Sequence, residues 1–190
     1  LGLDCLDDIA GAATEEAMWE PLVKKPAAVT NVDNDQLEGT AGNDAFVVVY
    51  SNTDVTSTVN ATNLGTFPLT TPLTLFGLGG TDSVTIVGTS GNDVLQVSSS
   101  GILINGALLI LNSIENVVLL GGAGDDTYQF DADSPLGLIS LDEVGGGVDT
   151  LDFSLTETIG ISINLDLATN QIVNSNLSLN LASASTFENV

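Results

Sequence analysis

The chain has 190 residues and a formal net charge of −23, from 25 acidic residues against two basic ones, Lys24 and Lys25. So few cationic side chains exclude nucleic acids and anionic membrane surfaces as partners, because both are bound through Lys and Arg. At 43% hydrophobic residues the chain can build a core, and with 5% aromatics that core must consist mainly of Val, Ile and Leu, which favour β-sheets. The sequence has no apolar run long enough for membrane insertion, and its single cysteine, Cys5, excludes an internal disulfide.

Residues 1–30 differ from the rest of the chain. Leu3, Leu6 and Ala13 fall near helical spacing, and Pro21 ends the pattern. This predicts an N-terminal helical cap over the end of the main domain, and a linker from a preceding domain fits equally well. Because there is no starting Met and no basic segment followed by an apolar stretch, we expect an internal or processed piece of a longer protein.

The main domain is expected to span residues 31–190. Residues 23–38 read as a connector, and the first strand is predicted at Ala45–Tyr50. Residues 51–72 are rich in Ser, Thr and Asn and contain two prolines, which predicts a loop or a pair of short exposed strands.

Short apolar strands follow closely from Leu73 onwards, separated by Gly, Asn, Ser and Asp. They are predicted at Leu73–Phe76, Ser83–Val87, Val94–Val97, Ile102–Ile104, Ala107–Leu111 and Val117–Leu120. Asn105-Gly106 favours a tight antiparallel hairpin between the fourth and fifth of these. An alternative is that Asn112 and Asn116 form a stacked ladder at a corner of the coil.

Residues 150–190 alternate between apolar and polar positions. The pattern covers Leu151–Leu155, Ile161–Leu167 and Leu177–Leu181, and period two predicts strands with one buried face. The closing residues 186–190 (TFENV) echo residues 113–117 (SIENV), which lead into a glycine-rich turn. By this analogy we expect another such turn to follow Val190.

That glycine-rich turn, residues 121–129, has the pattern G-G-x-G-x-D followed by a strand with Tyr128 turned inward. Glycines allow the backbone to curl so that carbonyl oxygens point at a cation, and Asp126 adds a carboxylate. Calcium prefers six to eight such oxygens at about 2.3–2.6 Å. Looser versions occur at residues 39–47, 79–84, 88–96 and 145–151.

These turns resemble the RTX (haemolysin-type calcium-binding) repeat family. The resemblance implies an all-β parallel β-helix, or β-solenoid, that binds Ca²⁺ at some of its turns. Spacings of eleven residues between Asp82 and Asp93 and thirty-three from Asp93 to Asp126 depart from the regular nine-residue repeat, so irregular coils are expected. Asp142 or Glu143 is also placed to reach a neighbouring turn. The predicted metal ligands are Gly121, Ala123, Gly124, Asp126, Asp44, Asn43, Asp82, Asp93, Asn92, Asp149 and Asp142.

The resemblance implies a calcium-stabilised structural module of a secreted cell-surface or extracellular-matrix protein, serving as stalk, adhesin or filament segment. Its open ends would permit head-to-tail self-association. The alternative is a secretion and folding module of a larger secreted enzyme. A β-helix polysaccharide-degrading enzyme is disfavoured, since the chain has no Arg or His and acid–base chemistry would depend on carboxylates alone. The chain is therefore not expected to be an enzyme.

Overall fold

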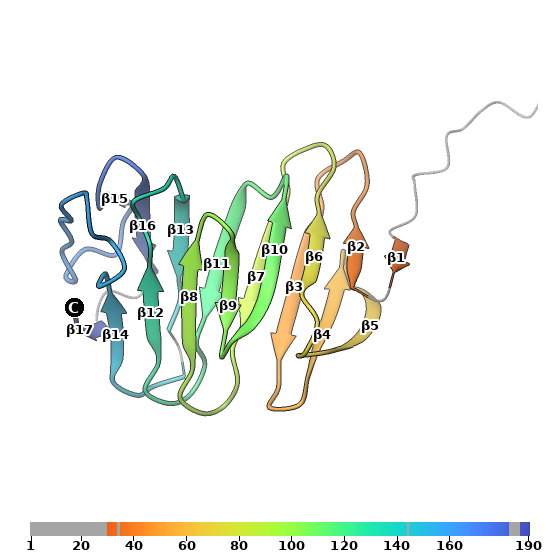
Figure 1. The fold of residues 1–190 in the computed structure, drawn as a ribbon, viewed down its shortest axis with the longest axis horizontal. Helices are drawn as coiled ribbons and strands as arrows, with labels where there is room; N and C mark the ends of the chain where they lie inside the picture. Colours follow the sequence, from red (N-terminus) through yellow and green to blue (C-terminus); the bar gives the residue numbers. More distant parts are fainter. Residues whose placement is uncertain (1–29, 34, 144, 183–186) are drawn as a thin grey trace, which may run out of the picture.

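The chain forms a β-solenoid of about 4 turns in which the described residues contain strands and turns but no helix (Figure 1). The computed structural model describes residues 30–33, 35–143, 145–182 and 187–190. The expected N-terminal cap lies outside this range, apart from Thr30. Within the described part of the chain, no helix is long and apolar enough to cross a membrane.

Seventeen strands make up the described structure. They are β1 (Thr30–Asp33), β2 (Gln36–Glu38), β3 (Ala45–Tyr50), β4 (Asp54–Val59), β5 (Thr62–Pro68), β6 (Leu73–Phe76), β7 (Ser83–Val87), β8 (Val94–Ser98), β9 (Gly101–Ile104), β10 (Ala107–Asn112), β11 (Asn116–Leu120), β12 (Thr127–Phe130), β13 (Gly137–Leu141), β14 (Asp149–Asp152), β15 (Gln171–Ile172), β16 (Leu177–Leu181) and β17 (Phe187–Asn189).

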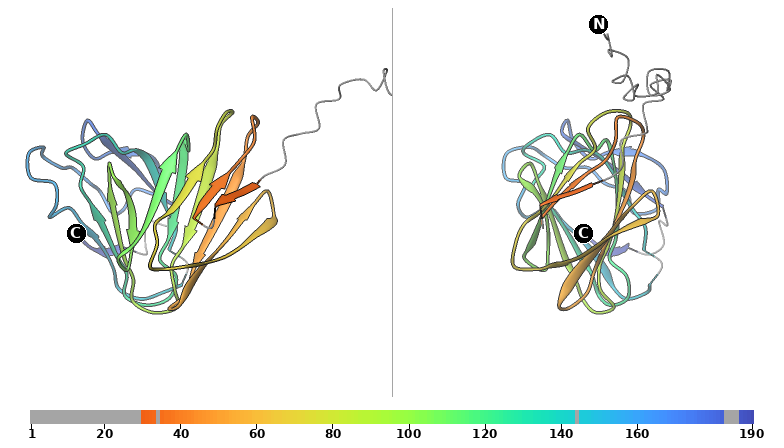
Figure 2. Two further views of the ribbon diagram at one scale, coloured as in Figure 1. Left: turned by 45° about the vertical axis from the view of Figure 1, so that its right-hand side comes forward. Right: turned by 90° about the vertical axis from the view of Figure 1, so that its right-hand side faces the viewer.

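The strands form two sheets that face each other across the core (Figure 2). Sheet A has the order β1-β2-β6-β10-β9-β8-β12-β14-β17, and sheet B has the order β15-β16-β13-β11-β7-β3-β4-β5. The chain passes from one sheet to the other, so that strands from successive coils pair in parallel, as β3, β7, β11, β13 and β16 do in sheet B. Successive coils therefore lie side by side along the long axis (Figure 1).

Each strand alternates between a side chain in the core and one toward the outside, as period two requires. In β7, Val84 and Ile86 are fully buried, and the alternate residues Ser83, Thr85 and Val87 are half-buried. The core consists mainly of Val, Ile and Leu, with Tyr128 packed edge-on against Phe187 and Phe130 stacked on Phe153. Tyr128 points inward as predicted and is fully buried. One coil alone cannot enclose a core, so the strands of neighbouring coils must cover such side chains.

Antiparallel strands interrupt the coils at β3-β4-β5 and at β8-β9-β10, and one two-residue turn in each has positive φ angles. Asn105-Gly106 connects β9 to β10 with φ angles of 50° and 86°, which confirms the predicted hairpin. Asn60-Ala61 connects β4 to β5 with φ angles of 49° and 63°, so residues 51–72 form a pair of strands rather than a loop. Positive φ at both central residues is the geometry that suits a two-residue hairpin. These strands are only partly exposed, since Val55, Val59 and Phe67 are in the core.

The strands predicted between residues 45 and 120 are confirmed to within a residue at each end. Leu177–Leu181 is confirmed as β16, whereas the strand predicted over Leu151–Leu155 already ends at Asp152, in β14. Two other predictions are wrong. Residues 36–38, expected within a connector, form β2, because Leu37 is buried and its backbone pairs with β6. Residues 161–167, expected as a strand, form no strand: their side chains alternate, but the backbone has no neighbouring strand and bonds within residues 162–173 instead.

Candidate metal centre

The turns that connect the sheets stack into two corners on opposite edges of the solenoid. The first corner contains turns 39–44, 77–82 and 113–115, which lead from sheet A to sheet B along the upper edge of Figure 1. The second corner contains turns 88–93, 121–126 and 142–148, which lead back to sheet A along the lower edge. The glycine-rich turns identified in the sequence all lie at these two corners.

Carboxylates connect successive turns within each corner. In the second corner the backbone N–H of Asp93 donates to Asp126 Oδ1 at 2.7 Å, and that of Asp126 donates to Asp149 Oδ1 at 3.0 Å. The N–H of Asp149 donates in turn to Glu188 Oε2 at 2.9 Å. Each turn thus supplies an acid to the turn before it, so that acidic groups line up along the edge.

Asp126, Glu143 and Asp149 bring three carboxylates together in the second corner. One oxygen from each lies within 4.8 Å of the others. All three residues are 1% exposed. Asp126 Oδ2 and Glu143 Oε2 have no hydrogen-bond donor among the described residues. Because burying an unpaired carboxylate oxygen is costly, this triad is the place where the fold most needs a proton or a cation.

The electrostatics of the triad follow from its burial. Desolvation, followed by the charges of Asp149 and Asp126, raises the pKa of Glu143 to about 7. Desolvation raises the pKa of Asp126 to about 6, against a hydrogen bond from the Asp93 backbone, and repulsion from Asp93 adds to the rise. The pKa of Asp149 is raised for the same first reason. Burial thus disfavours the charged form of all three carboxyls, and a divalent cation would neutralise them together.

The backbone beside the triad leaves room for no side chain. A β-carbon at Gly121 would overlap Asp126 Oδ2 and would lie 2.6 Å from Glu143 Oε1. The Gly121 N–H already donates to Glu143 Oε1 at 2.8 Å and to the Tyr128 hydroxyl at 2.5 Å. The absence of a β-carbon lets oxygens from two coils converge on one point. The donor set is made of hard oxygens alone, which fits a hard cation such as Ca²⁺ or Mg²⁺.

The triad contains two of the predicted ligands, Asp126 and Asp149, and one residue that the ligand prediction did not include. Glu143 takes the place given to its neighbour Asp142, which is not part of the triad. The alternation of buried and outward residues along β13 would have indicated Glu143 rather than Asp142. Ile139 and Leu141 point into the core, and Glu143 continues the same alternation beyond the end of the strand.

The other predicted ligands have different surroundings. The Asp44 and Asp93 carboxylates accept hydrogen bonds from nearby Thr and Asn residues. Asn43 Oδ1 and Asn92 Oδ1 each accept a backbone N–H from the following coil, at 2.9 Å. Asp82 keeps one buried oxygen without a donor among the described residues. Metal binding through the carbonyls of Gly121, Ala123 and Gly124 stays a prediction.

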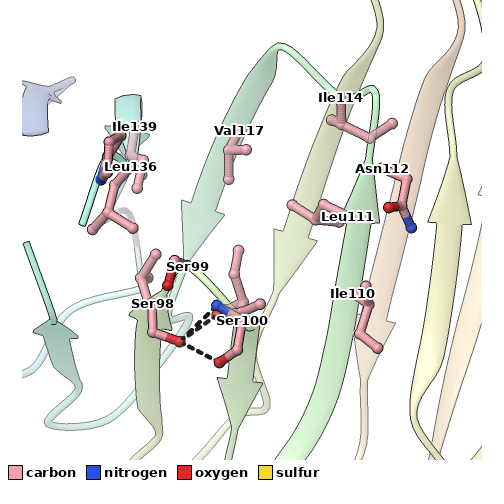
Figure 3. Close-up of a pocket in the computed structure, with 14 residues that line it drawn as sticks. Ser98, Ser99, Ser100, Ile110, Leu111, Asn112, Ile114, Val117, Leu136 and Ile139 are labelled. Atoms are coloured by element: carbon pink, nitrogen blue, oxygen red, sulfur yellow. Dashed lines mark hydrogen bonds between the residues drawn. The ribbon is translucent and has the colours of Figure 1, made fainter. Parts of the chain in front are cut away.

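A pocket of about 300 Å³ lies between the sheets, away from the triad (Figure 3). Its walls come from the β8–β9 turn, β10, β11 and the start of β13, with Ser98 and Ser100 hydrogen-bonded at its edge. Its lining is made of aliphatic side chains, three serines, one Asn, one Pro and one Gly, with no charged residue. The carboxylates of the triad are therefore not part of this pocket.

Comparisons of the chain with protein-family models, with curated proteins and with solved structures each returned no match. The fold and the acidic triad therefore define the class of protein, a β-solenoid with a possible metal-binding corner, and the likeness to RTX repeats rests on the motifs alone.

Proposed function

We propose that this chain is a calcium-stabilised structural module of a secreted cell-surface or extracellular-matrix protein. The observation that carries the proposal is the buried triad of Asp126, Glu143 and Asp149, with two carboxylate oxygens that lack a hydrogen-bond donor among the described residues. Asp126 belongs to the turn before β12, Glu143 lies in the turn before β14, and Asp149 is the first residue of β14. An ion held by all three would therefore cross-link two successive coils.

Calcium suits this site better than magnesium does. The available ligands are carboxylate oxygens and turn carbonyls, and calcium accepts six to eight such oxygens in flexible geometry. Magnesium requires near-ideal octahedral geometry at about 2.0–2.1 Å and keeps several of its waters. A corner of the backbone that holds buried carboxylates from two coils favours the larger and less demanding ion.

Cation binding would contribute directly to folding. With a net charge of −23, the metal-free chain repels itself, and the acids stacked at the corners concentrate that repulsion. An ion that binds only the folded state adds its binding free energy to the stability of the fold. Extracellular calcium modules typically bind with dissociation constants of about 10⁻⁴–10⁻³ M, which would keep such a chain unfolded in a low-calcium cytoplasm and fold it outside the cell.

A structural role is also supported by the burial of the three acids. A general acid or base must contact the substrate, whereas these side chains are 1% exposed and face one another. A polymer substrate cannot reach carboxylates that are buried in this way, whereas a metal ion held by them can stabilise the fold.

The test is a calcium titration of the EDTA-treated chain, followed by calorimetry and far-UV circular dichroism. We expect millimolar or lower calcium to raise β-structure and the thermal midpoint. Asp126→Asn and Glu143→Gln should weaken calcium binding at this corner at least tenfold, because each removes a buried ligand charge. Asp166→Asn removes the same charge from an exposed residue outside the corners and should bind calcium like the parent.

Two results would contradict the proposal. The first is a β-sheet spectrum and thermal midpoint that do not respond to calcium or EDTA. The second is a calcium response that all three variants share equally, since this would assign the effect to general charge screening and not to the triad.

A further inference from the structure

The first corner also contains a buried acid with an unsatisfied oxygen. Asp82 ends the turn 77–82 and is 1% exposed. Its Oδ1 accepts the backbone N–H of Asp44 at 2.7 Å, whereas its Oδ2 has no donor among the described residues. The Asp82 N–H donates to Glu115 Oε2 at 2.7 Å, which brings a second carboxylate to the same corner.

The free oxygen of Asp82 lies near a carbonyl oxygen of the next coil. A β-carbon at Gly77 would overlap both Asp82 Oδ2 and the Ser113 carbonyl oxygen, so these two oxygens lie close to the same point. Two neighbouring oxygen acceptors without a hydrogen between them repel. The glycine leaves the space between them free, as Gly121 does at the triad.

The unsatisfied oxygen is not a general result of this turn shape, because two other corner acids are fully satisfied by the protein. Asp44 Oδ2 accepts the N–H and hydroxyl of Thr40, at 2.6 and 3.0 Å, and its Oδ1 accepts the Asn60 amide at 2.6 Å. Asp93 has the same arrangement with Thr89 and Asn105. Where Asp44 has Thr40, the Asp82 turn has Leu78, which carries no donor on its side chain.

We propose that the first corner binds a second hard divalent cation, between Asp82 Oδ2 and the Ser113 carbonyl oxygen, with Glu115 adding negative charge. The inference rests on the proposed function for the choice of calcium. The two ions are separate, because β11 connects the two corners and its five residues span roughly 17 Å. Asp44 and Asp93, whose oxygens are already satisfied, bind none.

Asp82→Asn provides a sharp test because it should fold. An Asn side chain keeps an oxygen for the Asp44 N–H and places an N–H group toward the Ser113 carbonyl, in the position proposed for the ion. This variant should therefore be at least as stable as the parent in EDTA and gain less stability from calcium. Asp44→Asn is the matched control at the same corner: it disturbs satisfied hydrogen bonds and should leave calcium stoichiometry unchanged.

The experiment is isothermal calorimetry with calcium chloride on the full chain, with ¹H–¹⁵N spectra followed during the same titration. The parent should bind two ions, Asp82→Asn one and Asp44→Asn two. In the parent, amides of residues 77–82 and 113–116 should shift together with saturation, as should those of residues 121–126 and 142–149 at the triad. The spectra of the parent give a readout that does not depend on any variant.

Other outcomes separate the two proposals. A single ion in the parent that Asp126→Asn removes and Asp82→Asn retains would overturn the second site and leave the proposed function standing. A single ion that Asp82→Asn removes and Asp126→Asn retains would support the second site and count against the triad. Binding of no calcium by the parent would overturn both.

Discussion

At the scale of single residues, the buried carboxyl groups make stability depend on pH. The pKa of Glu143 is raised from 4.5 to about 7, and that of Asp126 from 3.8 to about 6, in both cases mainly by burial. At a pH between the unfolded and the folded pKa of each group, the folded chain keeps a proton that the unfolded chain releases. In EDTA we therefore expect the thermal midpoint to be highest near pH 4.5 and to fall by several degrees as the pH rises to about 7.

Calcium should reverse this trend, because it requires the deprotonated carboxylates and its affinity rises with pH. Differential scanning calorimetry between pH 4.5 and 8, in EDTA and in excess calcium, measures both curves. Glu143→Gln keeps the size of the side chain and removes its titration, so its metal-free curve should be flatter than that of the parent. An equal slope in parent and variant would show that Glu143 does not titrate in this range.

At the scale of elements, close approach between successive turns explains why the corners are rich in glycine. A β-carbon at Gly145 would overlap the backbone carbonyl of Gly122 in the previous turn. Gly145→Ala should therefore lower the free energy of unfolding by about 3 kcal/mol or more, since the backbone cannot move aside as a side chain can. Gly160→Ala is the control, because no atom lies near its β-carbon position and its φ is not positive.

Urea denaturation with intrinsic fluorescence measures both glycine variants under the same conditions. The control should change stability by no more than about 0.5 kcal/mol. Equal midpoints for Gly145→Ala and Gly160→Ala would mean that turn 142–148 does not pack on turn 121–126 as the structure has it.

The strands that the sequence predicted best are those whose neighbouring strands show the same alternation of apolar and polar residues. The strands predicted from Ala45 to Leu120 alternate in period two, and each has a paired strand on both sides, parallel or antiparallel, so local pattern and fold agree. Residues 161–167 have the same alternation without a neighbouring strand, and a strand needs a partner for its backbone as well as a buried face. The sequence contains the pattern but does not show which segments find a partner.

Turn chemistry shows the same limit. Asn105-Gly106 was recognisable as a hairpin because Gly readily adopts positive φ. Asn60-Ala61 makes an equivalent turn, but Ala seldom adopts a φ of 63°, so the sequence left both a loop and a strand pair open. Of the candidate site, the motif identified Asp126 and the later turn identified Asp149. For the third acid the sequence left Asp142 and Glu143 open, and the ligand prediction chose Asp142, whereas the alternation of β13 carries Glu143 to the buried side.

At the scale of the whole molecule, the corners of the described coils place acids on two opposite edges of the solenoid. The chain offers only Lys24 and Lys25 as positive side chains. Repulsion along the corners therefore acts between successive coils, in the direction in which the solenoid must stack. Simple salt screens such repulsion, with a Debye length of about 8 Å at 0.15 M, whereas a bound ion at a corner joins two coils directly. The two effects can be separated by experiment.

In EDTA, sodium chloride should raise the thermal midpoint gradually and without saturation up to molar concentrations, as expected for screening. Calcium chloride at a few millimolar should raise it further than sodium chloride of the same ionic strength and then saturate, because a limited number of sites fill. Magnesium chloride is the control of equal charge and should fall well below calcium. If magnesium and calcium act alike at every concentration, the corners are screened and not bridged, and the solenoid is held by its Val, Ile and Leu core alone.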